Sequence, residues 1–234
     1  RTLRMDADTT KTKDSYERIL SAFSNEQADV LIGTQMIVKG HDFPKVTLVG
    51  VLAADISLSA GDYRAGEKTF QLLTQAVGRA GRGTLPGEAV IQTYQPDHYA
   101  VVNAARQDYE SFYSEEILYR EMLGYPPAAH MLAVQIFSKE EERGKELAER
   151  LAAETGVGGM LRQGSRRTGA ETVLIGPAPA SIGRINDIFR FVFYVKSPEY
   201  DKLIQIKDIL EQKIQKMPPS NETVQFDFDP INTL

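Results

Sequence analysis

One short segment divides this sequence into two parts with different patterns. Residues 124–127 read Gly-Tyr-Pro-Pro, and a glycine followed closely by two prolines ends a helix and interrupts a sheet. Before this segment, apolar runs of strand length alternate with amphipathic stretches of helix length. After it, strands and helices follow in a different order. The chain has 234 residues, enough for two domains, so we predict a domain boundary at this segment.

The first part predicts an α/β domain over residues 1–105, followed by a helical linker over residues 106–125. Its strand-length runs are short and almost continuously apolar, which is typical of parallel strands buried on both faces of a sheet. Its amphipathic stretches carry apolar residues at helical spacing. Strands that alternate with helices along the chain favour a parallel sheet. The predicted elements are helices at 11–24 and 67–79 and strands at 30–34, 46–54 and 88–94.

The second part, residues 126–234, predicts a smaller α+β domain. Its strand, helix, strand, strand, helix, strand order is the βαββαβ order of a ferredoxin-like fold. Phe189, Phe191 and Phe193 alternate along one predicted strand, which favours a place in the core; a stacking platform for a single nucleic-acid strand is the alternative. The predicted elements are strands at 130–137, 172–175, 189–195 and 223–228 and helices at 140–161 and 200–216.

The composition excludes several kinds of site. The chain contains no cysteine, so neither a disulfide nor a thiolate zinc site can form within it, and His41, His98 and His130 are too scattered to predict a metal cluster. No apolar run approaches the length of about eighteen residues that spans a membrane, and the start does not read as a signal peptide. The net charge of −5 repels nucleic acid, so DNA binding requires local basic patches. Because the chain begins at Arg1 in polar sequence, we expect a piece of a longer protein.

Residues 61–69 are close to a phosphate-binding loop, the pattern G-x-x-x-x-G-K-[ST], but contain one residue too many. The extra residue, Glu67, precedes Lys68. Each residue of a helix turns by about 100°, so the insertion turns the ammonium group away from the phosphates and brings a carboxylate towards them. We therefore do not expect this segment to bind ATP. Asp55, at the end of a predicted strand, is interpreted as a helix or turn cap rather than a magnesium ligand.

Residues 75–82 read Gln-Ala-Val-Gly-Arg-Ala-Gly-Arg. Arg79 and Arg82 are three residues apart, which predicts both guanidinium groups on one face of a helix. The neighbouring glycines permit close approach of the backbone to another surface. Arginine suits a phosphoryl group because its planar fork donates hydrogen bonds in pairs and keeps its charge. The alternative is a solvated basic helix end, favourable against the helix dipole.

Residues 33–44 read Gly-Thr-Gln-Met-Ile-Val-Lys-Gly-His-Asp-Phe-Pro. Together with the arginine segment they resemble motifs V and VI of the second RecA-like lobe of superfamily-two helicases, in particular those of the bacterial replication-restart helicases, the PriA family. The resemblance continues through residues 124–127, 175–180 and 190–196. It implies that residues 1–105 are part of a RecA-like helicase lobe 2. The family's phosphate loop, Asp-Glu-x-His box and zinc-binding cysteines are not in this sequence.

The same resemblance implies roles for individual residues. Arg82 corresponds to the arginine finger that reaches the γ-phosphate of ATP, and Arg79 to its neighbour on the same phosphates. It implies that ATP and Mg²⁺ are bound mainly by the missing lobe 1, so this chain alone is expected to be inactive; Zn²⁺, which the full-length family binds, is not expected here. The residues implied to contact the nucleotide are Gly40, Asp42 and Gln75. The residues implied to bind DNA are Thr34, Gln35, Lys39, Arg184 and Arg190.

The predicted function is the C-terminal part of an ATP-dependent DNA helicase that recognises stalled or branched forks and restarts replication by primosome assembly. The partners implied by the resemblance are forked and single-stranded DNA, single-stranded-DNA-binding protein and primosome proteins. We expect a monomer, in the bacterial cytoplasm at the nucleoid and without a membrane. Two alternatives remain: a non-enzymatic module that binds DNA junctions or partners, and a small nucleotide hydrolase that uses residues 61–69.

Overall fold

Two compact units make up the described part of the chain. The computed structural model describes residues 1–38, 43–59, 61–157 and 171–231. Unit 1 comprises Arg1–Ala60 and Arg64–Tyr113, and unit 2 comprises Gly61–Tyr63 and Ser114–Leu234.

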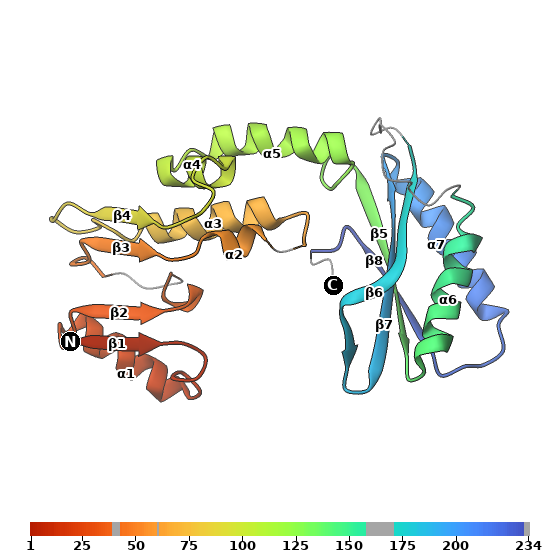
Figure 1. Cartoon of the computed structure of the whole chain (residues 1–234), viewed down its shortest axis with the longest axis horizontal. Helices are drawn as coiled ribbons and strands as arrows, with labels where there is room; N and C mark the ends of the chain where they lie inside the picture. Colours follow the sequence, from red (N-terminus) through yellow and green to blue (C-terminus); the bar gives the residue numbers. More distant parts are fainter. Residues whose placement is uncertain (39–42, 60, 158–170, 232–234) are drawn as a thin grey trace. The chain divides into compact units, whose positions relative to one another are not determined.

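Unit 1 is built from two pairs of parallel strands with helices beside them (Figure 1). Strand β1 pairs with β2, and β3 pairs with β4. Phe70 and Leu73 of α3 form an apolar core with Ala100 and Ala104 of α4 and with Phe112. The elements are β1 (Thr2–Met5), α1 (Lys13–Ser24), β2 (Val30–Gly33), the 3-10 helix η1 (Gln35–Val38), β3 (Leu48–Val51), α2 (Asp55–Leu58), α3 (Ala65–Val77), β4 (Glu88–Ile91), α4 (Tyr99–Arg106) and the start of α5 (Tyr109–Leu123). The α/β class is confirmed.

The strands of unit 1 are not buried on both faces, so that prediction was wrong. Ile32 of β2 is 57% exposed and Leu48 of β3 is 61% exposed. In β3 and β4, exposed residues alternate with partly buried ones. Strand side chains point alternately to the two faces, so in the described part of unit 1 only one face of these two strands is covered.

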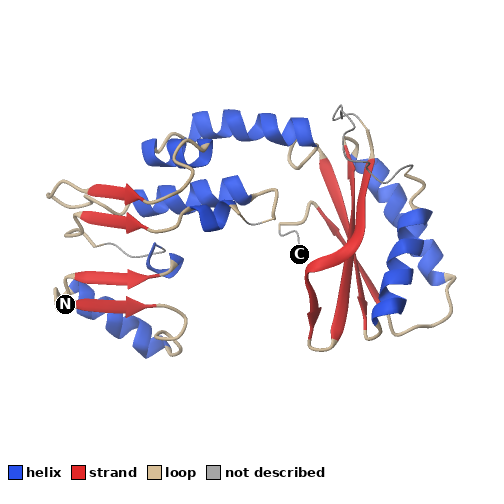
Figure 2. Cartoon of the chain, in the orientation of Figure 1, coloured by secondary structure: helices blue, strands red, loops and turns tan. Residues whose placement is uncertain are grey.

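Unit 2 has the predicted ferredoxin-like order. Its elements are β5 (His130–Ser138), α6 (Glu141–Glu154), β6 (Val173–Ile185), β7 (Ile188–Ser197), α7 (Tyr200–Gln215) and β8 (Thr223–Phe228). The four strands lie in the order β6-β7-β5-β8, and every neighbouring pair is antiparallel. Figure 2 shows α6 and α7 on the same side of this sheet. The βαββαβ prediction is confirmed, although α6 ends at Glu154 and β6 is longer than predicted.

The core of unit 2 lies between the sheet and these two helices. Phe191 and Phe193 are buried there with Leu151 of α6 and Leu210 of α7, and Phe189 packs against the same cluster. The alternating phenylalanines are therefore core residues, as their period of two predicted. Burying one such ring contributes about 1.5–3 kcal/mol to folding.

The chain passes into unit 2 within α5, after Tyr113, and not at the predicted break. The last turns of α5 belong to unit 2 because they are tied to it by hydrogen bonds from buried cations. Arg120 donates to the carbonyl oxygen of Pro126 at 2.6 Å, and Lys196 of β7 donates to that of Leu123 at 2.6 Å. The predicted linker, residues 106–125, is thus divided between the two units.

Candidate functional site

The two arginines singled out in the sequence lie in a loop that follows α3, not on a helix face. The helix ends at Val77, and Gly81 has a φ of +69°, a left-handed conformation that glycine adopts without strain. The prediction of a shared helical face was therefore wrong, because the glycines end the helix first. Arg79 is half-buried, and Arg82 is exposed with its Nε donating to the carbonyl oxygen of Gly78 at 2.7 Å.

Close backbone packing holds this arginine loop, residues 78–83, against another loop of unit 1. The amide of Gly81 donates to the carbonyl oxygen of Val46 at 3.0 Å. A Cβ atom on Gly83 would lie 2.1 Å from the carbonyl oxygen of Pro44, a separation that does not occur without a shift of the backbone. The arginine loop therefore packs against residues 44–46. In the sequence, these residues follow the segment 39–42, for which nucleotide contacts are predicted.

We expect Gly83→Ala to lower the free energy of unfolding of this chain by about 1–3 kcal/mol, the range for overpacking a tight contact. The reason is that Pro44 meets Gly83 through its backbone, which cannot rotate away as a side chain can. Urea unfolding followed by circular dichroism measures the change.

Gly50→Ala in β3 is the matched control, because a Cβ atom there would have no heavy atom within 4 Å. If both variants unfold at the same urea concentration, the close contact does not hold the loop.

Thr34 and Gln35 follow β2 at its carboxyl end, and both are exposed. In the parallel pair, Gly33 of β2 lies opposite Met5 of β1. A Cβ atom on Gly33 would lie 2.1 Å from the carbonyl oxygen of Met5, so only glycine fits there. The carboxyl edge of parallel strands is where α/β sheets bind ligands, and here it presents these two predicted DNA contacts.

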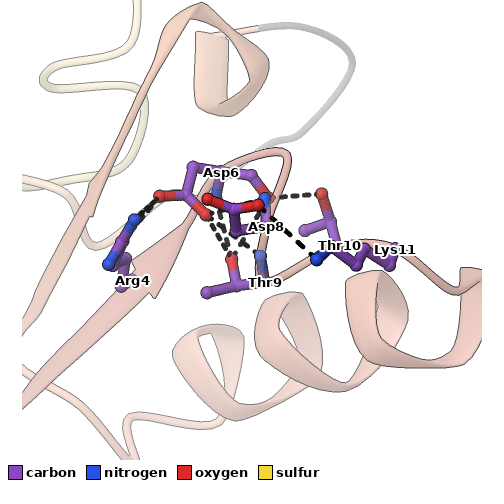
Figure 3. A network of polar contacts seen from close by, with 6 residues as sticks. All are labelled: Arg4, Asp6, Asp8, Thr9, Thr10 and Lys11. Carbon is purple, nitrogen blue, oxygen red and sulfur yellow. Dashed lines mark hydrogen bonds and ion pairs between the residues drawn. The ribbon is translucent and has the colours of Figure 1, made fainter.

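A polar turn that the sequence analysis did not single out occupies the same edge (Figure 3). The carboxylate of Asp6 accepts hydrogen bonds from the backbone amides of Thr9 at 3.0 Å and Asp8 at 3.2 Å, and Arg4 donates to it at 2.5 Å. The hydroxyl of Thr10 donates to the carbonyl oxygen of Asp6 at 2.6 Å. The hydrogen bond from the Thr9 amide, more than any other contact, lowers the pKa of Asp6 because it stabilises the ionised carboxylate. The carboxylate therefore orders residues 6–10 into a fixed turn beside Thr34.

The sequence did hold a signal for this turn. An aspartate followed by Thr9 at the third position is typical of a side chain that hydrogen-bonds its own backbone. Pairing of Met5 with Gly33 is what brings the turn next to Thr34, and that pairing is a tertiary feature.

Asp55 does not cap α2, because the N-cap of that helix is Ala54 and no side chain caps it by a hydrogen bond. Its carboxylate accepts hydrogen bonds from the hydroxyl of Thr93 at 2.6 Å and from the amide of Tyr94 at 2.9 Å. The hydrogen bond from the Thr93 hydroxyl, more than any other contact, lowers the pKa of Asp55 because it stabilises the ionised carboxylate. The carboxylate thus joins the start of α2 to the segment after β4.

Residues 61–69 do not form a phosphate cradle. Gly61–Tyr63 belong to unit 2, whereas the rest of the segment belongs to unit 1. The carboxylate of Glu67 accepts two hydrogen bonds from Arg64, at 2.7 and 3.0 Å. The side chain of Thr69, which would be the magnesium ligand of such a loop, is buried.

The structure places only some of the predicted nucleotide residues. Gln75 is exposed on the last turn of α3, close in sequence to the arginine loop. Lys39, Gly40, His41 and Asp42 lie outside the described residues.

Arg184 and Arg190, the predicted DNA contacts of unit 2, are not brought together. Arg184 forms an ion pair with Asp187 at 2.6 Å, and its guanidinium lies 4.9 Å from the ring centroid of Phe189. Arg190 lies instead over Phe137, at 5.8 Å. Phe189 packs against the helix-covered core, so its strand neighbour Arg190 points to the opposite face of the sheet.

Within the described residues, no three histidine, aspartate or glutamate side chains are grouped so that they could hold a metal ion. No helix in this described part of the chain has the length and apolar character needed to cross a membrane.

Comparisons with known proteins identify the family. The family "Helicase conserved C-terminal domain" matches residues 1–84, and "Primosomal protein N C-terminal domain" matches residues 121–231. The chain is 41% identical over 231 residues to the replication restart protein PriA of Bacillus subtilis, covering 98% of this chain and 28% of that protein. It is 37% identical over 232 residues to that of Synechocystis (99% and 26%) and 43% identical over 197 residues to that of Chlamydia pneumoniae (84% and 25%). The chain thus spans little more than a quarter of the length of these relatives. Both matching families are C-terminal domains, and the chain corresponds to the C-terminal part of such a protein. It belongs to the PriA family of replication restart proteins.

Proposed function

We propose that this chain is part of an ATP-dependent DNA helicase that restarts replication at stalled or branched forks, and that its arginine loop completes the ATP site. The relatives are named replication restart proteins, and one matching family is a helicase domain. The observation that carries the proposal is the packing of the arginine loop against residues 44–46, directly after the segment with the predicted nucleotide contacts.

The role proposed for Arg82 is to stabilise charge on the γ-phosphate during hydrolysis. Its Nε is engaged by the carbonyl oxygen of Gly78, which orients the planar guanidinium relative to the loop. A guanidinium remains charged at neutral pH and donates in pairs to phosphate oxygens. Arg79, three residues earlier and half-buried, is proposed to contact the same phosphates.

The described residues fit one side of an ATP site only. They supply arginines and Gln75, which suit phosphate oxygens, but among them no cluster of carboxylates is arranged to hold Mg²⁺. When ATP and Mg²⁺ are bound by another part of the full-length protein, the metal neutralises charge between the phosphates. The chain contains no cysteine, so thiolate zinc ligands of the kind implied by the resemblance cannot come from it.

DNA is proposed to lie along the carboxyl edge of β1 and β2. Thr34 and Gln35 are exposed there and offer hydroxyl and amide groups, which suit phosphate oxygens without reading bases. The turn of residues 6–10 flanks them and is held rigid by Asp6. Closure of the ATP site would move this edge of the sheet along the bound DNA strand. Contacts with forked DNA and with primosome proteins belong to the same proposal.

Phosphate release from ATP and Mg²⁺ tests this assignment. The full-length protein is expected to hydrolyse ATP when single-stranded DNA is added, whereas this chain alone is expected to release no phosphate above background. Hydrolysis by the isolated chain would favour a self-contained hydrolase. A full-length protein that binds forked DNA but does not hydrolyse ATP would instead be a non-enzymatic junction-binding module.

A further inference from the structure

The four-stranded sheet of unit 2 has two unlike faces. One face is covered by α6 and α7 (Figure 2), and Leu132, Val134 and Ile136 of β5 lie in that core. The alternate residues of each strand therefore belong to the opposite face. They are Met131, Ala133, Gln135 and Phe137 of β5, Arg190, Val192, Tyr194 and Lys196 of β7, and Thr223, Gln225 and Asp227 of β8.

One end of this opposite face is covered by other parts of unit 2. Met131 and Lys196, which are opposite each other in the sheet, are 1% and 3% exposed. The ammonium group of Lys196 lies 3.9 Å from the ring centroid of Tyr125. The ring of Tyr125 is stacked on that of Tyr63, with 5.0 Å between centroids, and the hydroxyl of Tyr63 donates to the carbonyl oxygen of Pro230.

The other end of the face is less covered. Phe137 lies opposite Arg190 on one side and Thr223 on the other. In the next row, Gln135 lies opposite Gln225. Phe137, Gln135 and Arg190 are half-buried, and the two β8 residues are exposed. We call these five residues the Phe137 face.

The Phe137 face carries one positive charge, that of Arg190. Arg190 is the single charged residue among the five, and its guanidinium lies over the ring of Phe137. No carboxylate of the described residues forms an ion pair with it. Arg184, by contrast, is paired with Asp187 on the other side of the sheet. A cation without an acidic partner, beside an aromatic ring and two amides, is complementary to a polyanion with flat bases.

We propose that the Phe137 face binds single-stranded nucleic acid, with a base stacked on Phe137 and a phosphate or base held by Arg190. Aromatic rings and guanidinium planes on an open sheet stack unpaired bases, and amides hydrogen-bond their edges. Paired bases in a duplex do not present their faces to such a surface, so duplex DNA is not the ligand. The inference rests on the proposed function only in taking DNA as the polymer, and it does not involve the ATP site.

The test uses the whole chain and a fluorescent oligothymidine of about 12 nucleotides, within the range that single-strand-binding folds occupy. Phe137→Leu keeps an apolar side chain but removes the aromatic ring, and Arg190→Ala removes the cation. Each is expected to weaken binding, measured by fluorescence anisotropy, by about 5- to 150-fold. Arg143→Ala is the matched control: it also removes one positive charge, but from α6 on the helix-covered side of the sheet, and it is expected to change binding less than about twofold.

Photo-crosslinking separates this site from the DNA contacts proposed for unit 1. An oligothymidine carrying a photoreactive thymine is expected to crosslink to β5 or β7 peptides that contain Phe137 or Arg190, and to do so less in the two variants. Unchanged binding in both variants, or crosslinks confined to unit 1, would overturn the inference. Equal competition by duplex DNA, or by an unrelated peptide, would overturn it as well. Because DNA-stimulated ATP hydrolysis by the full-length protein is measured separately, this inference and the helicase assignment can fail independently.

Discussion

In the full-length protein, Arg82→Ala is expected to lower the kcat of DNA-stimulated ATP hydrolysis by about 10³-fold or more, the range found for arginine fingers. In the proposed role, the guanidinium stabilises charge that develops on the γ-phosphate only in the transition state, so its loss is expected to raise the barrier more than it weakens ATP binding. Steady-state phosphate release at saturating ATP and DNA measures kcat, and anisotropy with labelled oligothymidine checks that DNA binding remains.

Two comparisons sharpen that experiment. Arg106→Ala removes an exposed arginine from the last turn of α4 in the same unit, and it is expected to leave kcat within about twofold of the unaltered protein. Arg82→Lys retains the charge without the planar fork, so it should recover only part of the rate. An Arg82→Ala protein with an unaltered rate would remove this residue from catalysis and leave the arginine loop as a structural feature.

The second large effect concerns a buried ion pair in α5. Arg120 and Glu116 are only 4% and 8% exposed, and Arg120 donates to the carboxylate at 2.6 Å and to the Pro126 carbonyl oxygen at 2.6 Å. Arg120→Ala would leave the carboxylate buried without its cation. We expect the free energy of unfolding to fall by about 3–5 kcal/mol, the range for breaking a buried pair. Urea unfolding followed by far-ultraviolet circular dichroism measures it.

The control is an exposed pair on another helix. Arg143 and Glu140 are 3.0 Å apart with side chains 60% and 63% exposed, so Arg143→Ala should change stability by less than about 1 kcal/mol. Replacing both members of the buried pair, Glu116→Leu with Arg120→Met, should restore much of the loss because no charge is then left unpaired. If the single and double variants are equally unstable, the cost comes from lost packing and not from the orphaned carboxylate.

The hydrogen bonds of Arg120 and Lys196 also explain why the domain boundary differs from the predicted one. From the sequence, residues 106–125 form a helical linker that ends at the double proline. In the structure, Arg120 reaches past the break to Pro126, and Lys196 reaches back to Leu123. The bond from Lys196 joins residues 73 apart in sequence and leaves no periodic signal, so the boundary within α5 could not be located from the chain.

At the candidate site, the arginine segment was likewise predicted only in part from the sequence. The residue types and their spacing indicated phosphate chemistry, and the glycines indicated a close backbone approach. The pattern also placed Arg79 and Arg82 on a helix, which was wrong because Gly78 and Gly81 end α3 before them. What the glycines approach is the chain's own segment at Pro44 and Val46, and no local pattern identifies that partner.

By itself, the sequence determined the type and order of most elements and the chemistry that is available, because apolar period, glycine and proline act locally and a side chain keeps its donors and charge in any fold. Tertiary structure alone decided which of those groups meet. It placed the turn at Asp6 beside Thr34 through the pairing of β1 with β2, and it put Arg184 and Arg190 on opposite faces of one sheet. Such proximity depends on which strands pair and on packing between distant segments, and no single short stretch of sequence specifies either.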